Sequence, residues 1–147
     1  MKIDHDALVM VVDGGKMLLF RNEGDVEFPK LQVEEAVEQD NPADRDLATD
    51  GPTQGRGGSA GLARGAIEKT SYHDLNEDQF AKDAVMMLNK RALSSDYEKL
   101  IIVAPSRTLG AMRKHYHKEL ESRLVGEIAK DLTGHPVGDI ETAISQI

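Results

Sequence analysis

The amino-acid sequence predicts an α/β fold with a mixed five-stranded sheet, and three patterns in the chain favour this class. Residues 7–13 and 100–104 are short apolar runs, which are typical of strands buried on both faces. A turn-forming Asp-Gly-Gly sequence follows the first run and precedes another apolar segment, which predicts a β-hairpin. Helical and strand-like segments then alternate to residue 147, and hairpins followed by such units build a mixed sheet with helices packed on it.

The antiparallel half of the sheet is predicted from residues 7–37. A strand at 16–21 returns from the Gly-Gly turn and pairs with the first strand. A third strand is expected at 26–37, where the apolar positions change parity at Pro29. Proline donates no backbone hydrogen bond, so a bulge or an edge position is expected there.

The second half of the chain predicts helix–strand units. A long helix is expected to begin at Asn76, which can cap it, and to end near Leu93. The remaining elements are, in order, a strand at 100–104 ended by Pro105, a short helix capped by Ser106, a strand at 124–129 and a helix begun near Pro136. Three antiparallel strands followed by such units satisfy a ribonuclease-H-like layout.

The length suits a single domain, residues 1–147, that contains one unusual connection. Residues 38–71 show no periodic pattern and hold six of the 13 glycines. A connection this long is uncommon inside a compact domain and is usually functional or disordered, so a long, mobile, glycine-rich loop is expected. Its first half is acidic, whereas three basic residues stand against Glu68 alone between Gln54 and Lys69.

Composition excludes several classes of protein. Cysteine is absent, which rules out disulfides, thiol catalysis and cysteine-ligated zinc. The net charge of -8 argues against a protein that coats nucleic acid through a broad basic surface. No apolar stretch approaches the roughly 18 residues that a membrane helix requires, so no membrane partner is expected. The first six residues carry acids where a signal peptide is basic, which favours a cytoplasmic protein.

The segment Gly55–Arg64 combines a flexible backbone with two guanidinium groups. Glycine lets the main chain approach another backbone or a phosphate closely, and arginine supplies forked donors for phosphate. A phosphate-contacting loop is therefore one interpretation, and a solvated, disordered loop is the other. The segment is no Walker loop, because the Gly-Lys-Ser/Thr ending is missing.

Residues 51–64 resemble the GGQ loop in the middle domain of eukaryotic and archaeal class 1 peptide-chain release factors. Arg56, Gly57 and Gly58 match the Gly-Arg-Gly-Gly-Gln run of that family position by position, and Ser59 stands where the family has glutamine. In that family the loop enters the ribosomal peptidyl-transferase centre and promotes hydrolysis of peptidyl-tRNA. The resemblance implies the ribosome or tRNA as a partner, and Ser59 argues against the hydrolytic step.

A wider resemblance covers most of the chain. Five ordered blocks are similar to the bacterial host-attachment protein family: Asp13, Asp50–Pro52, Phe80–Lys82, Val103–Gly110 and Lys130–Thr133. That family is named for attachment to host cells and is considered a bacterial relative of the release-factor middle domain. The resemblance implies a protein like that domain, and the family name implies a protein partner used in attachment.

A second candidate region is the end of the strand at 100–104. Ligands of α/β sheets usually bind at the carboxyl ends of strands. Arg107, close to a helix N-terminus, can hold an anion there, and Lys130 can approach the same rim. A capped turn with solvated side chains is the alternative. Structural or turn roles are assigned to Asp13, Asp50, Pro105, Gly110 and Asp131.

No catalytic residue, metal site or cofactor is predicted. Asp13 could begin a ribonuclease-H-type metal site, but such a site needs several converging acids, and the central strand ends in Ala104 and Pro105. No serine–histidine–aspartate set is recognisable. The leading hypothesis is therefore action at the ribosome or on RNA through Gly55–Arg64. A non-enzymatic attachment factor is the alternative, and a remnant hydrolase or nuclease is the least favoured.

Overall fold

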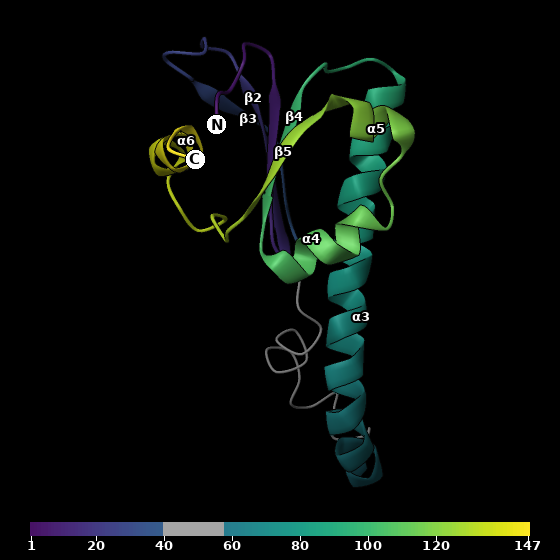
Figure 1. The fold of residues 1–147 in the computed structure, drawn as a ribbon. Coiled ribbons are helices and arrows are strands. Elements are labelled where there is room, and N and C mark those ends of the chain that lie inside the picture. The colour runs from purple at the N-terminus through teal and green to yellow at the C-terminus, as the bar shows by residue number, and fades with distance from the viewer. Residues whose placement is uncertain (40–57) are drawn as a thin grey trace.

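A computed structural model describes residues 1–39 and 58–147 of the chain, with side chains described outside 58–75. Its elements, in order, are β1 (Leu8–Val12), β2 (Lys16–Asn22), β3 (Leu31–Glu38), α3 (Gly58–Leu93), β4 (Leu100–Ala104), α4 (Ser106–Arg113), α5 (Lys118–Arg123), β5 (Leu124–Ala129) and α6 (Val137–Ser145). They form one sheet with helices on both of its faces (Figure 1). Within the described residues, no helix combines the length and apolar character that crossing a bilayer requires.

The sheet has five strands in the order β3-β2-β1-β4-β5. β1 and β3 both pair antiparallel with β2, whereas β4 pairs parallel with β1 and with β5. This mixed sheet confirms the predicted fold class, with three antiparallel strands followed by helix–strand units.

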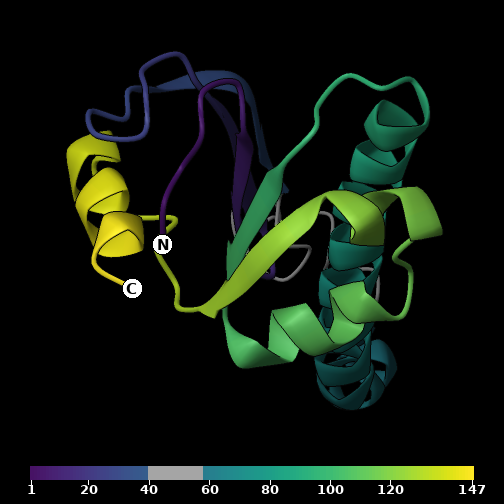
Figure 2. The same cartoon turned by 45° about the horizontal axis from the view of Figure 1, so that its top comes forward.

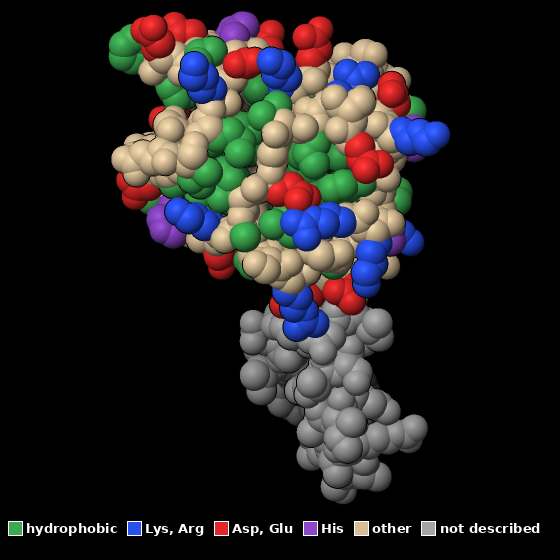
Figure 3. Space-filling view, in the orientation of Figure 1, with side chains coloured by type: hydrophobic (Ala, Val, Ile, Leu, Met, Phe, Trp, Pro, Cys, Tyr) green, Lys and Arg blue, Asp and Glu red, His purple; other side chains and the backbone are tan. Residues whose placement is uncertain are grey.

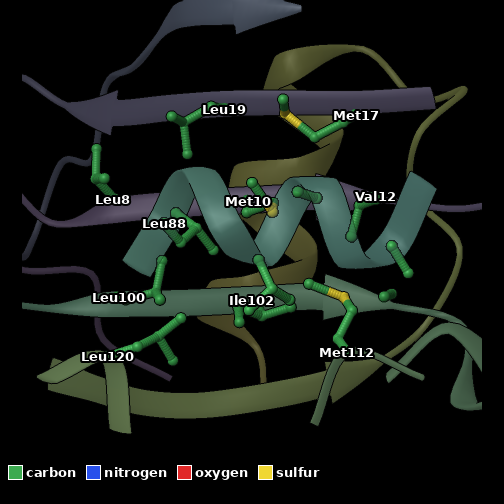
Figure 4. Packing of buried hydrophobic residues seen from close by; sticks show 14 of the residues in the cluster. Leu8, Met10, Val12, Met17, Leu19, Leu88, Leu100, Ile102, Met112 and Leu120 are labelled. Atoms are coloured by element: carbon green, nitrogen blue, oxygen red, sulfur yellow. The ribbon is translucent and has the colours of Figure 1, made fainter. Parts of the chain in front are cut away.

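Two apolar layers enclose the sheet because the side chains of each strand alternate between its faces. On one face, Leu8, Met10 and Val12 of β1 pack with Leu88 of α3 (Figure 4). On the other face, alternate residues of β1 and β4 pack with Ile140 of α6 and its neighbours. α3 and α6 therefore lie on opposite sides of the sheet, as Figure 2 shows.

The long helix corrects one sequence-based expectation. α3 begins at Gly58 rather than at Asn76, so residues 58–71, expected in the glycine-rich loop, are helical. Its 36 residues span about 54 Å, and its first half extends beyond the sheet (Figure 1). Residues 58–71 show no hydrophobic period, so periodicity could not reveal this part of the helix. The rest of the expected loop, residues 40–57, lies outside the described residues.

The third strand is shorter than expected. β3 begins at Leu31, after Pro29, and residues 26–30 form a loop. β3 is an edge strand, as expected. The bulge, however, lies farther along, where the register with β2 shifts between Leu19 and Phe20.

Two further details around α4 differ from the sequence-based expectations. Ser106 is the first residue of α4 and not its cap, because the N-cap position is Pro105 and no side chain bonds to the helix there. The six-residue helix α5 was not predicted. It begins after His117, whose Nδ1 accepts a hydrogen bond from the Glu119 amide at 3.0 Å.

A charge network ties the edge strand to α3. Glu34 of β3 accepts hydrogen bonds from Arg21 Nε at 2.7 Å and from Arg91 Nη1 at 2.8 Å. Both arginines also donate to Asp96, in the loop before β4, at 3.0 Å. Burial acts to raise the pKa of Glu34, but the two arginine hydrogen bonds outweigh it and lower that pKa below its ordinary value. The charged form of Glu34 therefore stabilises the fold.

We expect Glu34→Gln to lower the free energy of unfolding at pH 7 by about 1–2 kcal/mol. A carboxylate whose pKa is lowered by folding contributes its stability above its unfolded pKa, and this contribution is lost as the pH falls through the folded pKa. The difference between wild type and variant should therefore shrink at pH 3, as measured by urea unfolding at both pH values. Glu35→Gln, which removes only a 3.5 Å ion pair with Arg91, is the matched control with a smaller effect. A difference that does not depend on pH would contradict the assignment.

Candidate functional site at the carboxyl edge of the sheet

The three parallel strands end side by side. Val103 of β4 pairs with Val11 of β1 on one side and with Ile128 of β5 on the other. The chain therefore leaves the sheet at Asp13, at Pro105 and at the residue after β5 along one edge. This carboxyl edge is where α/β sheets usually bind ligands.

Asp13 links the β1–β2 turn to the segment that follows β5. Its Oδ1 accepts hydrogen bonds from the amides of Gly15 at 2.8 Å and Lys16 at 2.7 Å. Its Oδ2 accepts a hydrogen bond from the hydroxyl of Thr133 at 2.8 Å. Both carboxylate oxygens of Asp13 are thus engaged within the protein.

Thr133 holds two aspartates together at this edge. Its Oγ1 lies 2.8 Å from Asp13 Oδ2 and 2.9 Å from Asp131 Oδ1, and its side chain is nearly buried. A hydroxyl carries one proton, so it donates to one of the two carboxylates at a time. Sequence reasoning did not single out Thr133, although it closes the Lys130–Thr133 block that carries part of the family resemblance.

A third carboxylate approaches from α3. A Cβ placed on Gly14 would lie 2.4 Å from Oε1 of Glu77, so the Glu77 side chain rests directly against the turn after β1. This contact shows that α3 passes the carboxyl edge at Glu77. Among the residues that the structure describes, no three His, Asp or Glu side chains are grouped to hold a metal ion. The hydrogen bonds of Asp13 brace the turn between β1 and β2.

Basic side chains flank these acids. Arg107 is exposed in the first turn of α4, and Lys130 is exposed directly after β5, which contacts α4. α4 carries no acidic residue. A Cβ on Gly110, three residues after Arg107 and on the same side of the helix, would meet no atom within 4 Å. Packing therefore does not require glycine at this position, and α4 presents bare backbone beside Arg107.

The glycine-rich segment is only partly described. Asp50, Arg56 and Gly57 lie outside the described residues. Gly58, Ser59 and Arg64 belong to the first two turns of α3, on the side of the carboxyl edge (Figure 1). The surface above this segment carries both charge signs, with Lys or Arg beside Asp or Glu (Figure 3).

We expect Thr133→Val to lower the free energy of unfolding by about 1–3 kcal/mol, because it leaves two neighbouring carboxylates without their shared donor. Thr133→Ser keeps the hydroxyl and should retain most of the stability. Urea unfolding of wild type and both variants measures the difference. A smaller loss in Thr133→Val than in Thr133→Ser would show that the methyl group, and not the hydroxyl, stabilises this edge.

Known proteins resemble this chain in sequence and in structure. Uncharacterized protein RP470 of Rickettsia prowazekii (strain Madrid E) is 34% identical over 77 residues, which are 51% of this chain and 51% of that protein. The chain thus matches about half the length of this relative. The crystal structure of an archaeal translation termination factor, aRF1, superposes with a TM-score of 0.47 at 13% identity, covering 95% of this chain and 39% of that one. Residues 6–144 match the family model described as bacterial archaeo-eukaryotic release factor family 12. Since this match spans nearly the whole chain, the protein belongs to the bacterial archaeo-eukaryotic release factor family 12.

Proposed function

We propose that this protein acts in the cytoplasm, at the ribosome or on RNA, through the segment Gly55–Arg64. The main support is a position: the Gly-Arg-Gly-Gly sequence leads directly into α3 at Gly58, and the first half of α3 extends beyond the sheet (Figure 1). A motif at the far end of a long helix can reach a recessed site that the rest of the domain cannot enter. Membership of a release-factor family makes such a site on the ribosome the natural candidate.

The residue types of the segment suit an RNA target. Arg56 and Arg64 would donate to phosphates, because guanidinium groups match phosphate oxygens with paired donors. Gly57 and Gly58 would let the backbone approach closely. Ser59 replaces the glutamine of the release-factor motif, so we assign binding and no catalytic role to this segment. Arg107 and Lys130, exposed at the carboxyl edge, would add contacts to phosphates near the middle of α3, where Glu77 lies.

Ribosome co-sedimentation tests this proposal. Arg56→Ala combined with Arg64→Ala should weaken binding and reduce the salt dependence of the binding constant by about two charges, because each lost phosphate contact lowers the salt slope by about 1. Lys2→Ala combined with Lys30→Ala removes two exposed charges elsewhere and should leave both quantities unchanged. No binding by wild type, or equal binding by wild type and the arginine variant, would contradict the proposal.

A second candidate is a non-enzymatic protein-interaction factor that acts in attachment to host cells. It is favoured by apolar side chains on the edge strand β3, where Val33 and Val37 are exposed. An edge strand offers unpaired backbone groups to a partner strand. Recovery of a protein partner from cell extract that persists after nuclease treatment would favour this role, and loss of the partner on nuclease treatment would favour the ribosome or RNA.

A further inference from the structure

A groove of about 490 Å³ lies between α3 and the link that joins α4 to α5. α3 contributes Met86, Asn89, Lys90 and Leu93, and the link contributes residues 114–117. This groove is separate from the carboxyl edge, because it lies beside the C-terminal end of α3 whereas the edge lies beside Glu77.

The floor of the groove is apolar. Met86 and Leu93 are 43% and 60% exposed, and they lie seven residues apart on one side of α3. The stripe from Met86 to Leu93 is about 10 Å long, or two helical turns. The opposite stripe of α3 packs on the sheet through Leu88 and its neighbours. α3 therefore carries a second apolar stripe that the fold leaves uncovered.

The opposite wall is held in place from two sides. Asn89, nearly buried, donates to the carbonyl of His115 at 2.9 Å and accepts from the amide of His117 at 3.0 Å. Tyr116 donates its hydroxyl to Glu127 of β5. Burial, and then this hydrogen bond, raise the pKa of Tyr116, so its hydroxyl keeps the proton that it donates. Because this wall is already ordered, the protein loses less conformational entropy when a ligand binds.

The rim of the groove is positively charged. Lys90 and Lys114 supply this charge, His115 and His117 lie beside them, and no carboxylate is among the lining residues. The stretch 105–118 holds four Lys or Arg residues and no Asp or Glu, although the chain has 26 acidic against 18 basic residues. In Figure 3, Lys, Arg and His side chains lie along the right-hand edge, with some Asp or Glu side chains among them, where Figure 1 places α5 and the end of α4. Electrostatic complementarity therefore favours an acidic partner.

We propose that this groove docks an acidic amphipathic helix of a partner protein. Apolar side chains of the partner rest on Met86 and Leu93, and its carboxylates face Lys90 and Lys114. A groove two turns long between helices suits the helix-in-groove mode of peptide recognition. RNA fits less well, because bases stack on aromatic rings and guanidinium planes, whereas the floor of this groove is formed by the aliphatic side chains of Met86 and Leu93. The proposal does not depend on ribosome binding.

The probe is a fluorescein-labelled synthetic helix with leucines on one face and glutamates on the other, added to the full chain. Fluorescence anisotropy should give a dissociation constant in the micromolar range, and amide NMR shifts should change at 86–93 and 114–117. Lys90→Glu combined with Lys114→Glu should weaken binding about tenfold or more, and Leu93→Gln about fivefold. The double variant should still bind ribosomes like wild type, which separates this proposal from the function proposed above.

Matched control variants are Phe28→Gln, at a side chain that is 75% exposed, and Lys30→Glu, both far from the groove in the β2–β3 loop. They should bind the probe like wild type, and a probe with lysine in place of glutamate should not bind. No binding at 1 mM probe, or an equal loss of probe affinity in the control variants, would overturn the proposal. So would a single-stranded RNA 12-mer that binds the groove when the peptide does not. Self-association of the chain that Leu93→Gln abolishes would also overturn it.

Discussion

The parallel pairing of β1 with β4 is the constraint on which the rest of the fold depends. All five residues of each strand are fully buried, and none of them is polar. Burying each large aliphatic side chain contributes about 1.5–3 kcal/mol, so both faces of this pair must be covered. α3 covers one face and α6 the other. The parallel direction also brings the carboxyl ends of the two strands to one edge, so the position of the candidate site follows from the same pairing.

Sequence patterns revealed the elements that carry this core and missed those that do not. β1 and β4 are apolar runs, and α6 places Ile140 and Ile144 at helical spacing, so each could be predicted from its own residues. The first half of α3 extends beyond the sheet (Figure 1), and its sequence shows no periodic pattern. α5 is six residues long and buries Leu120 alone, which is too little signal. The role of Thr133 arises from a contact across 120 residues of sequence, which no local pattern contains.

Both proposed surfaces lie on α3, at opposite ends. Gly58 begins the helix and follows the release-factor-like motif, whereas Lys90 lies beside the groove. About 48 Å of helix separate these two residues. A partner in the groove therefore need not obstruct an RNA contact at the other end, and the molecule can bridge two targets. The acidic overall charge is compatible with both surfaces because each is basic only locally.

The geometry of α3 has a mechanical consequence. From Phe80, where the helix meets the sheet, to Gly58 is about 33 Å of helix. A tilt of about 5° at the packed end would move Gly58 by about 3 Å. In this geometry a small rotation at the packed end would be amplified along the helix. Substitutions around Leu88 would change the direction of α3 and so displace Gly58. They would do so without altering any residue of the segment Gly55–Arg64 that is proposed to contact RNA.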